Sequence, residues 1–251
     1  MKISRNTVLI TGGATGIGFA LAEAFLREGN EVIICGRRES KLLDAQKKLP
    51  RLHIKVCDVS KEEDRKLLFD WAKSNFKSLN ILVNDAGIQR EVDFTKGLLE
   101  LKESENEIKI NLEAPIYLST FFIPHLMNQK EAAIINVSSG LAFIPMAIAP
   151  VYCATKAAIH SFSSSLRHQL SGTVIKVYEV IPPIVDTELD KGAREARGQE
   201  NRGIKPEEVA LATMKGIEND EYEIAIGMAQ NLRTGSRTDP DRTFQLINKT
   251  H

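Results

Sequence analysis

The chain has 251 residues, of which 43% are hydrophobic, and its 33 acidic side chains balance 33 basic ones. A net charge of zero gives no general attraction to nucleic acid or to an anionic membrane, so we expect neither as a partner. The length fits one large α/β domain, so a single domain is expected over residues 1–251. The three cysteines form no CxxC pair, which argues against a disulfide framework and against a metal site.

The apolar stretches of the sequence are short. The run at 8–10 is followed at once by glycines, which does not suit a signal peptide. The longest weakly polar run, 141–152, contains two prolines and is shorter than the ~18–20 residues that span a bilayer. We therefore expect a soluble, cytoplasmic protein.

Short β-branched runs alternate with longer amphipathic segments. The strands are continuous apolar runs, which indicates a parallel sheet buried on both faces. Strict alternation favours right-handed crossovers and so predicts an α/β fold, a doubly wound Rossmann-type sheet of seven strands with helices on both faces. In chain order the predicted elements are strand 7–11, helix 16–28, strand 31–35, helix 39–48, strand 52–56, helix 61–75, strand 81–84, a long helix within 104–128, strand 132–137, helix 152–170, strand 174–181, helix 206–219 and strand 223–226.

Two segments near the end of the chain depart from this pattern. Residues 188–203 are rich in charge, glycine and alanine, and they lie between the sixth predicted strand and the next helix. We expect a mobile lid over a substrate cleft there, with a plain solvated loop as the alternative. After residue 230 the tail is polar until 244–247, an apolar run that could dock as a short helix.

A glycine-rich turn joins the first strand to the first helix. Without Cβ atoms the backbone can turn tightly and let a pyrophosphate approach, and the helix N-terminus offers free N–H groups to phosphates. A strand before this turn and a helix after it are the context that a dinucleotide site requires. The predicted cofactor-binding residues here are Thr11, Gly12, Gly13, Thr15, Gly16, Ile17 and Gly18.

The end of the second strand favours NADP(H) over NAD(H). An NAD site usually places a carboxylate there for the ribose hydroxyls, but Gly36 occupies the position. Arg37 and Arg38 follow, and a guanidinium can pair with a 2′-phosphate through two hydrogen bonds. The alternative is that both arginines are only solvated loop charges.

The third and fourth strands end in further candidate contacts to the cofactor. Asp58, followed by Val59, could accept a hydrogen bond from the adenine amino group or could cap the helix that starts near residue 61. Asn84, Ala86 and Gly87 end the fourth strand, where small residues would let the backbone lie against the cofactor. A simple turn is the alternative there.

Tyr152 and Lys156 are the candidate acid–base pair. On a helix, residues four apart share one face, with Cβ atoms about 5–6 Å apart. A nearby ammonium favours a phenolate, and acid–base catalysis works best when the catalyst's pKa lies near the working pH. Ser139, at the end of the fifth strand, could hold the substrate oxygen beside the phenol. Asn111, inside the preceding long helix, could hold a water that relays protons to Lys156.

These motifs together resemble the short-chain dehydrogenase/reductase family, in its short single-domain branch. TGxxxGIG at 11–18 and the later motifs stand in the family's order over nearly the whole chain. The resemblance implies the strand order 3-2-1-4-5-6-7, a homodimer or homotetramer, and a catalytic tetrad of Asn111, Ser139, Tyr152 and Lys156. The two last residues would also contact the cofactor, the lysine at the nicotinamide ribose. Within the family, the stretches 31–37, 86–89 and 150–156 are most similar to the DltE-type oxidoreductases, a group name that establishes no substrate.

The segment 181–187 resembles the family's PGxVxT motif, which implies that Pro182, Val185 and Thr187 lie at the nicotinamide. Two positions depart from the family pattern. Asp85 replaces the second asparagine of NNAG, and Pro183 replaces the glycine of PGxVxT, where it removes an N–H. Neither change removes a catalytic group.

The residues between Ser139 and Tyr152 are expected to border the active site. An apolar wall there would suit an uncharged, partly apolar carbonyl or alcohol substrate, and packing into the core or a subunit contact is the alternative. The wall would consist of Phe143, Ile144, Pro145, Met146 and Ile148. A stripe on the helix from 152, turned away from Tyr152, is expected to form a subunit interface or to pack within the chain, and it consists of Ala154, Ala158, Phe162 and Leu166.

The sequence therefore predicts an NADP(H)-dependent oxidoreductase that moves a hydride between the nicotinamide and a carbonyl or secondary alcohol of a small molecule. A non-catalytic NADP(H)-binding sensor on the same fold is the alternative, although a sensor has no need of the whole tetrad. A sugar-nucleotide epimerase or dehydratase is disfavoured, because TGxxGxxG and a larger substrate region are both missing from the sequence.

Overall fold

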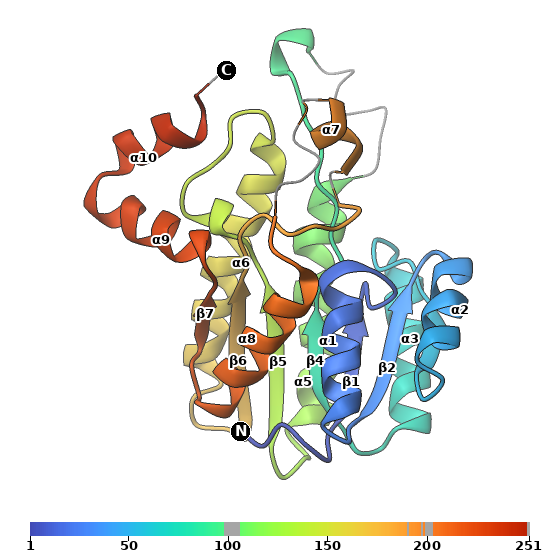
Figure 1. Ribbon diagram of the computed structural model, residues 1–251. Helices are drawn as coiled ribbons and strands as arrows, with labels where there is room; N and C mark the ends of the chain where they lie inside the picture. The colour runs from blue at the N-terminus through green and yellow to red at the C-terminus, as the bar shows by residue number, and fades with distance from the viewer. Residues whose placement is uncertain (98–105, 190, 197, 199–202, 250–251) are drawn as a thin grey trace.

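The computed structural model describes residues 1–97, 106–189, 191–196, 198 and 203–249 (Figure 1). Seven parallel strands form one sheet in the order β3-β2-β1-β4-β5-β6-β7. This confirms the predicted doubly wound α/β fold and its strand order. The strands are β1 (Thr7–Thr11), β2 (Glu31–Gly36), β3 (His53–Val56), β4 (Leu79–Asn84), β5 (Ala132–Val137), β6 (Ile175–Ile181) and β7 (Glu223–Ala225).

Helices cover both faces of the sheet and create two hydrophobic cores (Figure 1). One face carries α1 (Gly16–Arg27), α2 (Glu39–Lys48) and α8 (Pro206–Glu218). The other face carries α3 (Glu62–Asn75), α5 (Ala114–Leu126) and α6 (Pro150–Gln169).

Strand β1 shows why an unbroken apolar run serves both cores. Val8 and Ile10 are buried in the core beneath α1, whereas Leu9 is buried in the core beneath α5. Successive side chains of a strand point to opposite faces of the sheet. Burying one such side chain contributes about 1.5–3 kcal/mol, so both faces are held by the same few residues.

The centre of the sheet contains the point where the strand order reverses. β1 lies between β2 and β4 in the sheet. The helix that follows β1, α1, packs on one face of the sheet, and the helix that follows β4, α5, packs on the other face. The crevice beside such a reversal, at the carboxyl ends of the strands, is where ligands bind in open α/β sheets.

Three differences from the predicted elements concern segments near the carboxyl ends of the strands. The helix predicted from residue 152 begins at Pro150, since proline is well suited to the first helical position. The described part of the helix predicted within 104–128 contains a π-helical turn, Lys109–Glu113, before α5, and residues 104–105 lie outside the described residues. The tail forms two helices, α9 (Met228–Thr238) and α10 (Pro240–Ile247), where the sequence predicted only a short one.

The predicted lid, residues 188–203, lies partly outside the described residues. Its described part includes α7 (Lys191–Ala196), and its mobility stays a prediction, as does the single domain. In the predicted interface stripe, Leu166 is buried and Phe162 packs against the core beneath α3 and α5, so this half packs within the chain. Ala154 is exposed, and the homodimer or homotetramer stays a prediction. Among the described residues, no helix has both the length and the apolar character needed to span a bilayer.

Candidate active site

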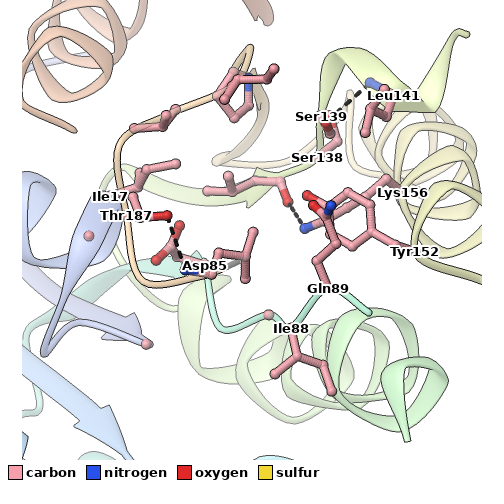
Figure 2. A pocket seen from close by; sticks show the side chains of 18 of the residues that line it. Ile17, Asp85, Ile88, Gln89, Ser138, Ser139, Leu141, Tyr152, Lys156 and Thr187 are labelled. Carbon is pink, nitrogen blue, oxygen red and sulfur yellow. Dashed lines mark hydrogen bonds between the residues drawn. The ribbon is translucent and has the colours of Figure 1, made fainter. Parts of the chain in front are cut away.

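A cavity of about 1250 Å³ opens at the carboxyl edge of the sheet. It is larger than most small-molecule pockets, which are about 300–1,000 Å³, so it has room for a dinucleotide and a second small molecule. Figure 2 shows side chains that line it, from the turn before α1, the end of β4, the end of β5, the start of α6 and the segment after β6. The predicted site residues that line it are Gly12, Thr15, Gly16, Ile17, Gly36, Arg37, Arg38, Asp58, Val59, Ala86, Gly87, Ser139, Tyr152, Lys156, Pro182, Val185 and Thr187.

The glycine-rich turn brings backbone to the floor of this cavity. Gly12 has φ +70°, and a Cβ there would lie 2.9 Å from the Cα of Ala86, so only glycine fits between β1 and the end of β4. Gly16 has φ +56°, and a Cβ there would lie 3.1 Å from Cγ2 of Thr187. Thr15, the N-cap of α1, makes no capping hydrogen bond with its side chain, so its hydroxyl does not compete with a ligand for the N-terminal N–H groups of α1, of which that of Gly18 bonds to Asp85.

Five predicted site residues, Thr11, Gly13, Gly18, Asn84 and Asn111, do not line the cavity. The hydroxyl of Thr11 accepts hydrogen bonds from the N–H groups of residues 85 and 86, each at 3.1 Å. The Asn84 side chain donates to Asn136 Oδ1 at 2.8 Å and so joins β4 to β5. The two glycines permit close packing behind the turn. These residues support the cavity wall from behind, and the direct cofactor contacts predicted for the first four stay a prediction.

Tyr152 and Lys156 lie together at the end of the cavity beside β5, both from the first turns of α6 (Figure 2). Their side chains are buried, and Nζ of Lys156 lies 5.6 Å from the centre of the Tyr152 ring. Nζ also donates a hydrogen bond to the carbonyl oxygen of Val137, at the end of β5, at 2.8 Å. Helical spacing and this bond to the sheet fix the ammonium beside the phenol.

The two serines after β5 have different surroundings. Ser138 is buried and donates to a carboxylate oxygen of Glu179, a fully buried residue of β6. The hydroxyl of Ser139 accepts a hydrogen bond from the N–H of Leu141 at 3.1 Å (Figure 2), and Ser139 lines the same cavity as Tyr152. Because the hydroxyl of Ser138 bonds to Glu179, Ser139 remains the candidate for holding a substrate oxygen, and that role stays a prediction.

Asn111 occupies the π-helical turn before α5. Its Oδ1 accepts from the N–H of Ile88 at 2.9 Å, and its Nδ2 donates to the carbonyl of Ile88 at 2.8 Å and to Thr155 Oγ1 at 3.2 Å. A Cβ on Gly87 would lie 3.4 Å from Oδ1 of Asn111 and 3.7 Å from Nζ of Lys156. The amide thus ties the segment after β4 to α6. Its part in a water relay stays a prediction.

Asp85 is a titratable group that the sequence analysis noted only as a departure from the family motif. It lines the cavity at the end of β4, and its carboxylate accepts a hydrogen bond from the N–H of Gly18. Burial raises the pKa of Asp85 to about 7, against the opposing effect of the Lys156 charge. Burial likewise lowers the pKa of Lys156 to about 8, against the charges of Asp85 and Glu179. Both groups therefore titrate close to neutral pH.

Replacing Asp85 with asparagine is expected to move the alkaline limb of the activity profile to lower pH by about one unit. Loss of the carboxylate removes a charge that stabilises the Lys156 ammonium, so the buried lysine releases its proton at lower pH. The measurement is kcat/KM for the cofactor between pH 6 and 10, which follows ionisations of the free enzyme. Asp70→Asn, on the exposed side of α3, is the control. An unshifted limb in Asp85→Asn would contradict the coupling.

Cationic side chains gather at the opposite end of the cavity. Arg37 and Arg38 follow β2, and Lys41, which the sequence analysis missed, joins them from the first turn of α2. Such a lysine can be recognised from sequence by its place one turn after the arginine pair.

Asp58, which follows β3, is not the N-cap of α3, as one of the two predictions for it had it. Its carboxylate accepts from the N–H and hydroxyl of Ser60 at 3.0 and 2.7 Å, and the N-cap position of α3 is Lys61. Burial acts to raise the pKa of Asp58, but the bonds from Ser60 and the charges of Lys61 and Arg37 outweigh it and hold the pKa below its usual value. The carboxylate remains on the cavity wall, where the adenine contact stays a prediction.

Two of the five residues predicted for the apolar wall line the cavity. Met146 and Ile148 line the cavity, but Phe143, Ile144 and Pro145 do not. Ile144 is 3% exposed, so it belongs to the protein core, and Phe143 packs its ring against His160 at 4.7 Å between centroids. The missing part of the wall comes from Leu141 and from the C-terminal helices, through Met228, Leu232, Leu246 and Ile247.

The C-terminal end of α10 is held against this wall by Asn248. Its Oδ1 accepts from the N–H of Ala147 at 2.6 Å, and its Nδ2 donates to the carbonyl of Pro145 at 3.0 Å. The sequence predicted that 244–247 could dock as a short helix, but it did not place the tail at the cavity, and it missed α9 because the tail before residue 244 looked polar. The available signal was the four-residue spacing of Met228 and Leu232, which places both on one helix face.

The class of protein follows from this fold and from a comparison with known families. Residues 6–198 match the family model described as short chain dehydrogenase. The chain belongs to the short-chain dehydrogenase/reductase family, and it is an oxidoreductase of that family, whose members bind NAD(P).

Similar proteins agree with this assignment. The uncharacterized oxidoreductase DltE of Bacillus subtilis (strain 168) is 50% identical over 248 residues, which cover 99% of this chain and 98% of that protein. A short chain dehydrogenase from Burkholderia cenocepacia J2315, solved with NADP, is 25% identical, with a TM-score of 0.82 and full coverage of both chains. A short chain dehydrogenase/reductase from Burkholderia phymatum, solved with NAD, has the same fold at 20% identity, with a TM-score of 0.84 over 100% of this chain and 98% of that one.

Proposed function

We propose that this chain is an NADP(H)-dependent oxidoreductase acting on the carbonyl or secondary alcohol of a small, partly apolar substrate. One observation carries the proposal. A single cavity holds the buried Tyr152 and Lys156 at one end and the cations Arg37, Arg38 and Lys41 at the other. The first group suits acid–base chemistry at a carbonyl, and the second suits a 2′-phosphate.

The residues between these ends fit a dinucleotide. Gly12 and Gly16 line the cavity between these ends, where they present backbone with no side chain, and Thr15 and Ile17 line it at the N-terminus of α1. A diphosphate placed there would receive N–H groups and the positive end of the helix dipole. Thr187, against Gly16, and Val185 would then lie along the nicotinamide half of the cofactor.

When bound, the nicotinamide supplies or accepts the hydride. Tyr152 donates a proton to the carbonyl oxygen during reduction and removes it from the alcohol during oxidation. Ser139 donates a hydrogen bond to the same oxygen and so orients the substrate. Lys156 holds positive charge beside the phenol, and Asn111 fixes the segment that packs against Lys156.

The outer part of the cavity supports a substrate that is at least partly apolar. Leu141, Met146 and Ile148 form one side of it, and Leu232 and Leu246 come from the C-terminal helices. Burying apolar substrate surface there contributes about 25 cal/mol per Å² before the costs of binding are counted. A polar carbonyl group would point inward, to Ser139 and Tyr152.

Replacing both Arg37 and Arg38 with alanine is expected to lower kcat/KM for NADPH by roughly ten- to a hundredfold and to leave NADH turnover nearly unchanged. Hydrogen bonds to charged groups contribute about 1.5–3 kcal/mol, and NADH has no 2′-phosphate to lose them. The assay is a panel of ketones and aldehydes with each cofactor. Arg27→Ala, at the exposed end of α1, is the control. Wild-type turnover with NADH at least as good as with NADPH would overturn the cofactor choice.

A further inference from the structure

Glu188 lies on the segment after β6 and lines the cavity together with the cations that follow β2. Its Oε2 pairs with Nη1 of Arg38 at 3.2 Å, and its Oε1 pairs with Nζ of Lys41 at 2.9 Å. All three side chains are part of the cavity wall. These pairs join two walls that are about 150 residues apart in the sequence.

The cations that Glu188 engages are those suited to a 2′-phosphate. A phosphate monoester carries more negative charge than a carboxylate and offers three acceptor oxygens, so it is the stronger partner for the same donors. The pairs are also half exposed, with 51% of the side chain of both Arg38 and Glu188 accessible, and exposed ion pairs are weak. A carboxylate held this loosely is readily replaced by a phosphate.

We propose that Glu188 is a specificity-determining residue whose carboxylate occupies the 2′-phosphate subsite on Arg38 and Lys41 until NADP(H) displaces it. The inference rests on the proposed NADP(H) dependence. Binding of the phosphate and pairing of Glu188 are mutually exclusive at these two side chains, so each weakens the other by the same factor.

NAD(H) carries no phosphate with which to displace Glu188, so it binds with the pairs intact. Thr187 precedes Glu188 in the chain and lies close to the glycine-rich turn, since a Cβ on Gly16 would be 3.1 Å from its Cγ2. Release of Glu188 by the phosphate therefore frees a segment that also borders the proposed diphosphate and nicotinamide sites. The two cofactors would leave this segment in different states.

The test is Glu188→Gln, which keeps the size of the side chain and removes its charge. Two weak ion pairs give an expected three- to tenfold tightening of NADPH and of 2′,5′-ADP, with NADH within about twofold of wild type. Dissociation constants come from fluorescence titration or calorimetry of the full chain. Glu218→Gln, exposed at the end of α8, makes the same change of charge away from the cavity and is expected to change nothing.

A second comparison isolates the two cations. In a chain that already carries Arg38→Gln and Lys41→Gln, adding Glu188→Gln is expected to have no further effect on NADPH binding, because the pairs are gone. Thermal unfolding of every variant verifies that the fold is retained.

The outcomes separate this inference from the proposed function. If wild type prefers NADPH but Glu188→Gln binds it no more tightly, or more weakly, the role of Glu188 is wrong and the proposed function stands. If wild type binds NADH as well as NADPH and does not bind 2′,5′-ADP, the proposed cofactor choice itself fails.

Discussion

Replacing Tyr152 with phenylalanine is expected to lower kcat roughly a thousandfold, while the dissociation constant of NADPH stays within about threefold of wild type. The change removes one oxygen from a ring that is 6% exposed, so the packing of the first turn of α6 is kept. What is lost is the proton donor next to the Lys156 ammonium. Steady-state turnover of a ketone and direct titration with NADPH measure the two quantities separately.

Tyr117→Phe makes the same chemical change on the exposed face of α5 and is expected to keep full turnover. Activity of Tyr152→Phe within tenfold of wild type would contradict the acid–base role. A protein that only senses NADP(H) would bind the cofactor but would turn over no substrate, either as wild type or as Tyr152→Phe.

Replacing Lys156 with methionine is expected to lower kcat/KM by about a hundredfold or more. Methionine matches the length of the buried stem but leaves the carbonyl of Val137 without the bond that Nζ supplies at 2.8 Å. It also removes the positive charge that acts on Asp85, so the pKa of that carboxyl is expected to rise above its present value of about 7. Asp85 would then be mostly neutral at neutral pH.

The measurement for Lys156→Met is kcat/KM across the pH range, together with the tightness of cofactor binding. The alkaline limb assigned to the lysine is expected to disappear rather than to shift, which distinguishes this variant from Asp85→Asn. Lys66→Met, on the exposed side of α3, is the control. A value of kcat/KM within threefold of wild type would show that the ammonium has no part in the reaction.

Local sequence patterns predicted the sheet, the glycine-rich turn and the proximity of Tyr152 and Lys156 well. The apolar run of β1 and the glycines after it placed the cavity floor, because they are confined to one turn with one workable geometry. Tyr152 and Lys156 met as predicted, since a four-residue spacing on a helix leaves little freedom. Where residues close in sequence determine the geometry, the sequence alone was enough to predict it.

Features that depend on distant segments were the ones missed. Ile144 is buried in the core and does not line the cavity, and no local sequence pattern distinguishes these two positions. Asn248 bonds to the cavity wall from the far end of the chain. The pairing of Glu188 with Lys41 joins segments 147 residues apart. Asp85 looked like a small departure from a motif because its altered pKa depends on burial and on Lys156, and neither is visible in a string of letters.

The π-helical turn at Lys109–Glu113 makes the site sensitive to the deletion of a single residue. Such a turn is what one additional residue produces within an α-helix, and single π-helical turns are frequent at functional sites. Losing a residue there would restore regular winding and would also rotate Asn111 by about 100°, away from Ile88. A regular helix at this position would therefore point the amide of Asn111 away from the backbone of Ile88, and the π-helical turn is what allows the two hydrogen bonds between them.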